Sequence, residues 1–215
     1  MNLKGMLKEN SLKGKTILVT GGATGLGKSM ATYFLELGAN IVIASRKKEV
    51  LDKTSKELMD KHGGKVLGLS CDVRKYNEVE ETLEKIKLEF GSLDILVNNA
   101  ALYGSLERGH FETLPESQWD DVMAVNVKGT WQCSKAALPA MRDVGGGSII
   151  NIASLAAVYG MPQGLDYVAS KAAVIGMTRA MARELGDEKI RVNAIAPSAV
   201  MTEGTSEFFC DRFVL

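Results

Sequence analysis

Short apolar runs rich in β-branched residues alternate along this chain with longer segments of helical periodicity. Six such runs are expected to be strands, at 15–20, 40–45, 65–71, 93–97, 148–153 and 190–196. The intervening helices are expected at 28–37, 49–61, 76–90, 115–141 and 165–185, the fourth in two pieces. Strands that alternate with helices form parallel sheets covered by helices on both faces. The sequence therefore predicts an α/β fold with a doubly wound parallel sheet of about six strands.

Length and composition indicate one globular domain over residues 1–215. Hydrophobic residues make up 46% of the chain, and 26 basic side chains balance 26 acidic ones. Zero net charge argues against a nucleic-acid or acidic membrane partner. No segment approaches the ~20 apolar residues of a membrane span, and the first residues lack a signal-peptide pattern, so we expect a cytoplasmic protein. Three scattered cysteines and two histidines favour neither a disulfide scaffold nor a metal site.

A glycine-rich loop joins the first strand to the first helix. Residues 20–27 read TGGATGLG, with glycines at 21, 25 and 27. Glycine lets the backbone turn tightly and approach a ligand, and the N-terminus of a helix offers unpaired N–H groups to a phosphate. The position is that of a dinucleotide-binding loop, although its spacing is GxxxGxG rather than GxGxxG. We expect the pyrophosphate of a dinucleotide to bind here.

The end of the second strand predicts which dinucleotide is preferred. An acidic side chain there binds the ribose 2′-hydroxyl of NAD(H), whereas an arginine suits the 2′-phosphate of NADP(H). This chain has Ser45 followed by Arg46, Lys47 and Lys48, with no carboxylate among them. The planar guanidinium of Arg46 and the hydroxyl of Ser45 can both engage a phosphate. We therefore expect NADP(H) rather than NAD(H), although the basic run can also be no more than a solvated helix start.

A candidate catalytic group lies in the last long helix. Tyr167 and Lys171 are four residues apart and so share one helix face. A nearby ammonium is expected to lower the pKa of the tyrosine and make it a usable acid or base. Ser154 follows the fifth strand, and Asn98 and Asn99 follow the fourth. Open α/β sheets bind ligands at the carboxyl ends of their strands, so we expect these side chains at one rim with the glycine loop.

Taken together, these motifs resemble those of the short-chain dehydrogenases/reductases. They are TGGATGLG at 20–27, CDV at 71–73, NNAA at 98–101, VNVKG around Asn126, NIAS ending at Ser154, YVASK at 167–171 and RVNAIAPSAVMT at 191–202. The similarity extends over 12–209, with 1–11 an N-terminal extension and 210–215 an atypical tail. It implies a Rossmann-type fold and hydride transfer between NADP(H) and a ketone or secondary alcohol, with a 3-oxoacyl thioester as one candidate substrate.

The resemblance also implies a role for each matching residue. Tyr167 is the expected general acid or base, Lys171 lowers its pKa and binds the nicotinamide ribose, and Ser154 holds the substrate oxygen. Asn126 is expected to hold a relay water, or only to tie its helix to the fourth strand. The implied cofactor contacts are Gly21, Thr24, Gly25, Leu26, Gly27, Ser45, Arg46, Asp72, Val73, Asn98, Ala100, Tyr167, Lys171, Pro197 and Thr202.

Two of these contacts are specified further. The resemblance places Asp72 at the adenine amino group, although an aspartate there can also serve only as a helix N-cap. It places Thr202 at the nicotinamide carboxamide.

Loops 100–111, 155–166 and 200–209 are expected to line the substrate side. Their apolar members are Leu102, Tyr103, Leu106, Phe111, Tyr159, Met161, Leu165 and Phe208. Basic residues are few in these loops, and Arg108 is the exception. This composition favours an uncharged or acyl-type ketone.

The chain departs from the family pattern in two places. Ser198 follows Pro197 where the family has glycine, and the family continues beyond Thr202 with part of a lid, a helix and a seventh strand. We therefore expect the final edge strand of the family to be missing here. The helices at 115–142 and 165–185, which resemble the family's dimer-forming pair, are retained and predict a homodimer.

Two other functions stay open at this point. The chain can be a truncated homologue that binds nucleotide but is weakly active or inactive. It can also be a sugar-nucleotide epimerase or dehydratase, against which its short length and GxxxGxG spacing count.

Overall fold

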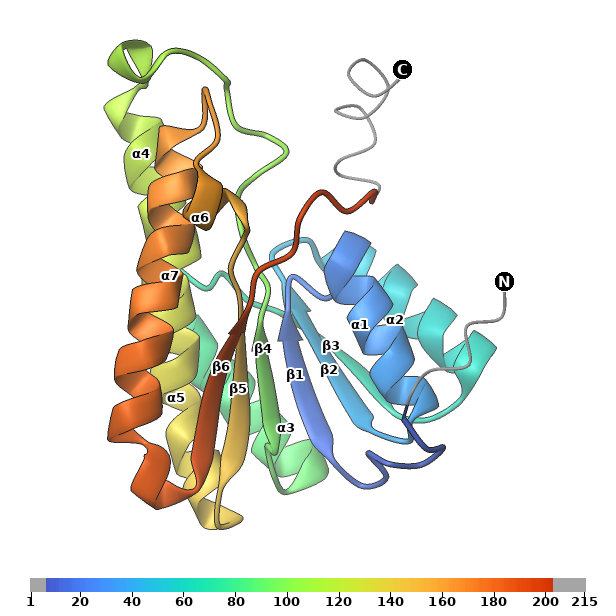
Figure 1. Ribbon diagram of the computed structural model, residues 1–215. Coiled ribbons are helices and arrows are strands. Elements are labelled where there is room, and N and C mark those ends of the chain that lie inside the picture. Colours follow the sequence, from blue (N-terminus) through green and yellow to red (C-terminus); the bar gives the residue numbers. More distant parts are fainter. Residues whose placement is uncertain (1–6, 203–215) are drawn as a thin grey trace.

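The computed structural model describes residues 7–202 and contains one parallel sheet (Figure 1). The strand order is β3-β2-β1-β4-β5-β6, and every neighbouring pair is parallel. The strands are β1 Thr16–Thr20, β2 Asn40–Ser45, β3 Val66–Ser70, β4 Ile95–Asn98, β5 Gly147–Ile152 and β6 Ile190–Ile195. All six predicted strands are present, with ends that differ from the prediction by at most two residues.

Seven α-helices accompany the strands in the described part of the chain. They are α1 Gly25–Glu36, α2 Lys48–His62, α3 Tyr76–Phe90, α4 Glu116–Val122, α5 Thr130–Asp143, α6 Ala156–Tyr159 and α7 Leu165–Glu184. The predicted two-piece helix is α4 and α5, joined by a π-helical turn at Met123–Gly129. The prediction began α1 three residues too late, because Gly25 and Gly27 belong to its first turn rather than to the loop. The short α6 was not predicted.

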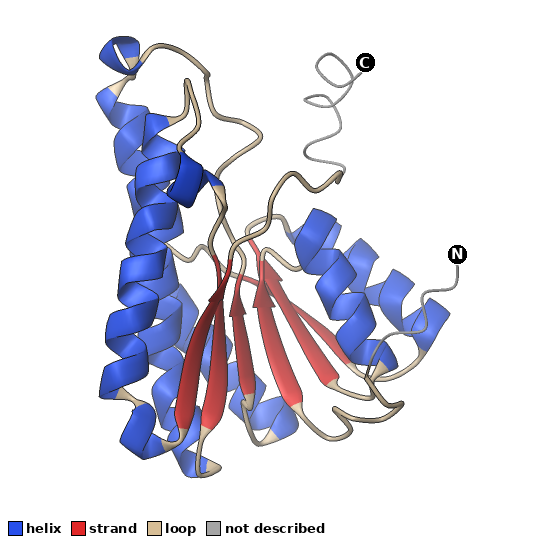
Figure 2. Cartoon of the chain, viewed as in Figure 1, coloured by secondary structure: helices blue, strands red, loops and turns tan. Residues whose placement is uncertain are grey.

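The sheet separates two apolar cores, as a doubly wound fold requires. Successive residues of a strand point to opposite faces, so Leu18 and Ile17 enter different cores. One core holds the inner faces of α3 and α5, including Ile86 and Met141. The other holds residues of α1 and α2 such as Leu35, Leu51 and Leu58. Figure 2 shows the sheet between these helical layers. Burial on both faces explains why the strands are almost continuously apolar.

The strand order reverses at β1, which lies between β2 and β4. The chain therefore leaves β1 toward one edge of the sheet and returns beside it in β4, with Val19 opposite Val97. In open α/β sheets, ligands bind outside the carboxyl ends of the strands at such a reversal. The glycine loop and the residues that follow β4 both lie at this point.

No helix within residues 7–202 is both long enough and apolar enough to cross a membrane.

Candidate active site

The glycine loop is fastened to the end of β4 by two side chains. The Thr20 hydroxyl accepts hydrogen bonds from the backbone N–H groups of Asn99 (3.0 Å) and Ala100 (3.1 Å). In return, Asn99 Nδ2 donates to the carbonyl oxygens of Thr20 (2.9 Å) and Gly21 (3.1 Å). Asn99 was expected at this rim from its place just after the fourth strand, whereas Thr20 was given no role. The signal for Thr20 was a polar residue at the very end of its strand.

The glycines of this loop are required by backbone conformation, by close packing, or by both. Gly21 and Gly25 have positive φ angles of 64° and 51°. A Cβ on Gly27 would lie 2.3 Å from the Gly21 carbonyl oxygen, so no other residue fits there without a shift of the backbone. Thr24 is exposed and Leu26 half-buried between them.

The start of α1 fits a bound pyrophosphate. No side chain caps its N-terminus, and its first turn carries no acidic residue. Its first N–H groups and the positive end of its dipole therefore face no anionic side chain of the helix itself. In the described part of the chain, these backbone N–H groups are donors of the kind that a dinucleotide phosphate needs.

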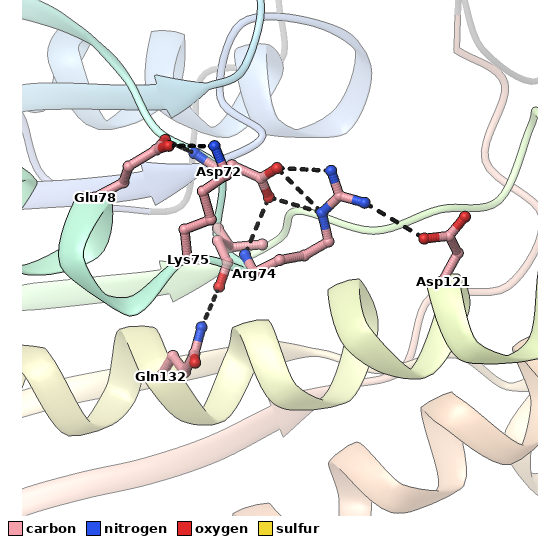
Figure 3. A network of polar contacts seen from close by, with 7 residues as sticks. Asp72, Arg74, Lys75, Glu78, Asp121 and Gln132 are labelled. Carbon is pink, nitrogen blue, oxygen red and sulfur yellow. Dashed lines mark hydrogen bonds and ion pairs between the residues drawn. The ribbon is translucent and has the colours of Figure 1, made fainter.

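Asp72 lies after β3 in a polar network that Figure 3 shows from close by. Its carboxylate accepts hydrogen bonds from the backbone N–H of Arg74 (3.0 Å) and from the Arg74 guanidinium, the shortest being 2.7 Å. These bonds hold the pKa of Asp72 below its ordinary value. Arg74 also reaches Asp121 on α4 at 3.3 Å. This role of Arg74 was not predicted. Its hydrogen bonds use much of the accepting capacity of the Asp72 carboxylate, which was expected to contact adenine.

The residues expected to select the cofactor lie at the same rim. Ser45 ends β2 beside Ser70 of β3. Arg46 is exposed, and its positive charge adds a small contribution to the lowered pKa of Asp72. Val73 is buried, and its carbonyl oxygen accepts a 2.7 Å hydrogen bond from Gln132 on α5.

Asn98 does not line the rim with its side chain as expected. It is buried, and its Nδ2 donates to Ser134 Oγ on α5 and to Asn151 Oδ1 on β5, both at 2.9 Å. The side chain of the last residue of β4 points into the molecule, toward α5 and the neighbouring strand. Ala100, two residues further along, lies beside Gly21.

Tyr167 and Ser154 meet at the carboxyl end of β5. Tyr167 is 9% exposed, and the neighbouring Ser154 hydroxyl favours its phenolate form. The Ser154 hydroxyl also accepts a 3.2 Å hydrogen bond from the N–H of Ala156. Lys171 lies one turn further along α7 and is buried, with its Nζ 5.8 Å from the centre of the Tyr167 ring. Its ammonium donates a 2.6 Å hydrogen bond to the carbonyl oxygen of Ile152 on β5. The structure thus brings together three of the four predicted catalytic residues.

The pKa of Tyr167 departs from the expectation. Burial is the largest cause and raises the pKa above its ordinary value of 10.0, whereas the neighbouring Ser154 hydroxyl lowers it. Lys171 is not among the contributions to this shift, and its ammonium donates instead to the Ile152 carbonyl oxygen. Burial also lowers the pKa of Lys171 from 10.5 to about 8. Of Tyr167 and Lys171, the lysine is therefore the group with the lower pKa and the one that titrates nearer to neutrality.

Asn126 serves as a structural tie. It lies in the π-helical turn, 1% exposed, and its Oδ1 accepts a 2.8 Å hydrogen bond from the N–H of Leu102. Its Nδ2 donates to the Leu102 carbonyl oxygen (3.3 Å) and to Ser170 Oγ on α7 (3.0 Å). Each group of the carboxamide is thus engaged, and the side chain joins the loop after β4 to α7.

The segment after β6 runs from the loop of Ser154 to the glycine loop. The Pro197 carbonyl oxygen accepts a 3.0 Å hydrogen bond from the N–H of Leu155, next to Ser154. Five residues later, Thr202 faces Gly25, since a Cβ on that glycine would lie 3.5 Å from the Thr202 Cβ. Ser198 stands where the family has glycine, and the chain from Pro197 to Thr202 still brings Thr202 to Gly25.

The expected substrate-side residues divide into two groups. Leu102, Tyr103, Leu106 and Met161 pack in one apolar cluster with Tyr167. Phe111, Tyr159 and Leu165 are instead exposed. Phe208 and the tail at 210–215 lie outside the described residues.

Comparison with known proteins places this site among oxidoreductases. A family model described as short chain dehydrogenase matches residues 15–212. A 3-oxoacyl-[acyl-carrier-protein] reductase of Thermotoga maritima is 38% identical over 196 residues, which are 91% of this chain and 78% of that protein. An NAD-dependent glycerol dehydrogenase of Listeria innocua is 36% identical over 203 residues, 94% of this chain and 77% of that protein.

A solved structure agrees in fold. The crystal structure of the 3-ketoacyl-(acyl-carrier-protein) reductase of Brucella melitensis complexed with NADH has a TM-score of 0.85 and is 32% identical. The match covers 91% of this chain and 80% of that chain.

Buried Lys171 predicts a dependence of stability on pH. The folded state protonates Lys171 less readily than the unfolded state does, so between pH 8 and 10.5 the unfolded chain binds more protons and folding becomes more favourable as pH rises. Relative to Lys171→Met, the wild type should gain at most about 3 kcal/mol in free energy of unfolding over this interval. Denaturant unfolding of both proteins from pH 7 to 10.5 measures this difference. A difference that stays constant with pH would contradict the lowered pKa.

Proposed function

The chain belongs to the short-chain dehydrogenase family and is an NAD(P)-dependent oxidoreductase, and on that premise we propose that it interconverts a ketone and a secondary alcohol with NADP(H). The observation that carries this proposal is the pairing of Tyr167 with Ser154 at the carboxyl rim of the sheet. The phenol is the proton donor, and the glycine loop that suits a dinucleotide lies at the same rim.

In the direction of reduction, NADPH bound at this rim would supply the hydride for the carbonyl carbon and leave as NADP+. Tyr167 donates its phenolic proton to the carbonyl oxygen, and the products are the alcohol and a phenolate. Ser154 donates a hydrogen bond to the same oxygen and stabilises the negative charge that develops there. The raised pKa of Tyr167 keeps the phenol protonated at neutral pH, which suits an acid in this direction.

Lys171 stabilises the phenolate after proton transfer and hydrogen-bonds the nicotinamide ribose in this proposal. Its position one helical turn from Tyr167 supports both tasks. Both Nδ2 hydrogens of Asn126 are donated to Leu102 and Ser170, and its Oδ1 accepts from Leu102, so we assign the side chain the structural tie rather than a relay.

We assign NADP(H) rather than NAD(H) from the charge at the end of β2. Arg46 is exposed there, and no carboxylate competes for a ribose 2′-hydroxyl within 45–48. Arg46 and Ser45 would hold the 2′-phosphate, while Gly21, Thr24, Gly25, Leu26 and Gly27 would hold the pyrophosphate. Asp72, Val73, Ala100, Pro197 and Thr202 complete the proposed contacts.

For the substrate we propose an uncharged or acyl-type ketone such as a 3-oxoacyl thioester. The apolar cluster of Tyr103, Leu106 and Met161 around Tyr167 supports an apolar substrate. The similar reductase of Thermotoga maritima, by its name, acts on a 3-oxoacyl group.

We further propose that two copies pair through the surfaces of α4–α5 and α7. These helices lie side by side on one flank of the molecule (Figure 1). Trp131 on α5 is 47% exposed, and Ala172 and Gly176 on the exposed side of α7 allow a second helix to approach closely.

Replacing Tyr167 by phenylalanine tests the assigned acid. The Tyr167→Phe variant keeps the ring but has no proton to donate, so kcat for acetoacetyl-coenzyme A reduction should fall by about 100-fold or more. The Kd for NADPH should stay within about twofold, as measured by calorimetry. Tyr33→Phe is the matched control, because Tyr33 lies in the second half of α1, outside the proposed site, and it should retain full activity. Undiminished turnover in Tyr167→Phe would exclude this mechanism.

Charge reversal at Arg46 tests the choice of cofactor. Arg46→Asp replaces the proposed phosphate-binding group by one that suits a 2′-hydroxyl, so the Kd ratio of NADH to NADPH should change by at least about tenfold in favour of NADH. Lys56→Asp changes the net charge of the protein by the same amount at an exposed position of α2. It should leave the Kd ratio of NADH to NADPH near that of the wild type. An equal change in both variants would show that Arg46 has no specific role.

A further inference from the structure

The ring of Tyr103 packs directly on the ring of Tyr167. Their centroids are 4.7 Å apart and the rings are inclined by 55°, which is a favourable geometry for an aromatic pair. Tyr103 belongs to the loop after β4, whereas Tyr167 belongs to α7, more than sixty residues later in the chain. The contact therefore depends on whatever holds this loop in place.

A carboxamide holds the start of the loop. Asn126 pairs with both the N–H and the carbonyl oxygen of Leu102, the residue before Tyr103, and also donates to Ser170 on α7. Two bonds to one peptide residue determine its orientation as well as its position. The backbone that carries the Tyr103 ring is thus fixed relative to α7.

A second carboxamide holds the end of the loop in the same way. Gln118 on α4 accepts a hydrogen bond from the N–H of Glu107 (3.0 Å) and donates to its carbonyl oxygen (3.1 Å). Gln118 Nε2 also donates to Asp166 on α7 at 2.9 Å. Asp166 is 2% exposed, and its other oxygen accepts from the N–H of Tyr167 at 2.8 Å. Both ends of the loop are therefore tied to the turn of α7 that carries Tyr167.

Arg108 holds the Tyr103 ring from within the loop. Its guanidinium carbon lies 4.8 Å from the centre of that ring, and its Nη2 donates to the Tyr103 carbonyl oxygen at 3.4 Å. The same guanidinium packs against Gly164, where an added Cβ would lie 2.7 Å from Nη1. Gly164 directly precedes α7, so Arg108 is a third connection between the loop and this helix.

We propose that Tyr103 is a positioning residue for proton transfer by Tyr167. The loop at 102–108, tied to α7 by Asn126 and Gln118, holds the Tyr103 ring against the Tyr167 ring, fixes its orientation and keeps water from one side of it. This inference rests on the proposed role of Tyr167 as the acid. It assigns a function to the Tyr103 ring itself rather than to its hydroxyl.

The charges around Tyr167 are consistent with this role. Burial raises the pKa of Tyr167, Tyr103 raises it further, and Arg108 lowers it. Lys171 and Asp166, on the same helix as Tyr167, are the other ionisable groups beside it. Removal of the Tyr103 ring admits water, so the pKa of Tyr167 should fall toward its ordinary value.

The test compares Tyr103→Ala with Tyr103→Phe, which keeps the ring. The first readout needs no substrate. Phenolate absorbance is titrated in each variant with and without Tyr167→Phe, and the difference isolates Tyr167 among the five tyrosines. Tyr167 should titrate about one pH unit lower in Tyr103→Ala than in Tyr103→Phe. Equal titration in the two variants would overturn the proposal.

The second readout is the reduction of acetoacetyl-coenzyme A with NADPH. Tyr103→Ala should lower kcat by about tenfold and move the alkaline limb of its pH profile to lower pH, with KM for NADPH unchanged. Tyr103→Phe should match the wild type within about twofold, and equal losses in both variants would overturn the role of the ring. Gln118→Ala frees the loop without changing either ring, and it should shift kcat and the profile in the same direction. An unchanged kcat and profile in Gln118→Ala would likewise count against the proposal.

Failure of the positioning role of Tyr103 can be distinguished from failure of the proposed function. If Tyr167→Phe abolishes turnover while Tyr103→Ala leaves the titration and kcat unchanged, the acid is correctly assigned and only the positioning role fails. If the wild type and Tyr167→Phe reduce the substrate equally, the proposed function fails, and the substrate-free titration still decides whether Tyr103 controls Tyr167.

Discussion

The reciprocal hydrogen bonds between Thr20 and Asn99 are the interaction on which the arrangement of this site depends. They join the carboxyl ends of β1 and β4, the two strands between which the chain reverses direction across the sheet. The glycine loop is held beside the residues after β4 as a result, and α1 begins with its N–H groups at the rim. A buried backbone with both donors and acceptors satisfied is costly to deform, so this rim is preorganised for a ligand.

A second set of polar ties organises the other half of the site around α7. Asn126 and Gln118 each pair with a loop residue and with a side chain of α7, so the loop after β4 and the helix of Tyr167 form one unit. The segment after β6 closes the arrangement, since Pro197 contacts the Ser154 loop and Thr202 faces Gly25. Four separate parts of the chain thus converge on one rim, as the parallel topology requires.

Much of this was predictable from sequence because the relevant signals are local. Apolar runs and helical periodicity predicted all six strands. The strand–loop–helix pattern and the YVASK motif predicted that Ser154, Tyr167 and Lys171 come together at the carboxyl ends of the strands. Long-range contacts were not predictable in this way. The sequence does not show that Arg74 occupies the Asp72 carboxylate, that the Asn98 side chain turns inward, or that Lys171 bonds a carbonyl instead of lowering the pKa of Tyr167.

The most direct test of this account is thermal unfolding of the 215-residue chain titrated in parallel with NADPH and NADH. A ligand at 100 times its Kd adds about 2.7 kcal/mol to the stability of the folded state. We expect one cooperative transition whose midpoint rises with either nucleotide, and at lower concentrations of NADPH than of NADH. A midpoint unchanged by both nucleotides would contradict the claim that this rim is a preorganised dinucleotide site.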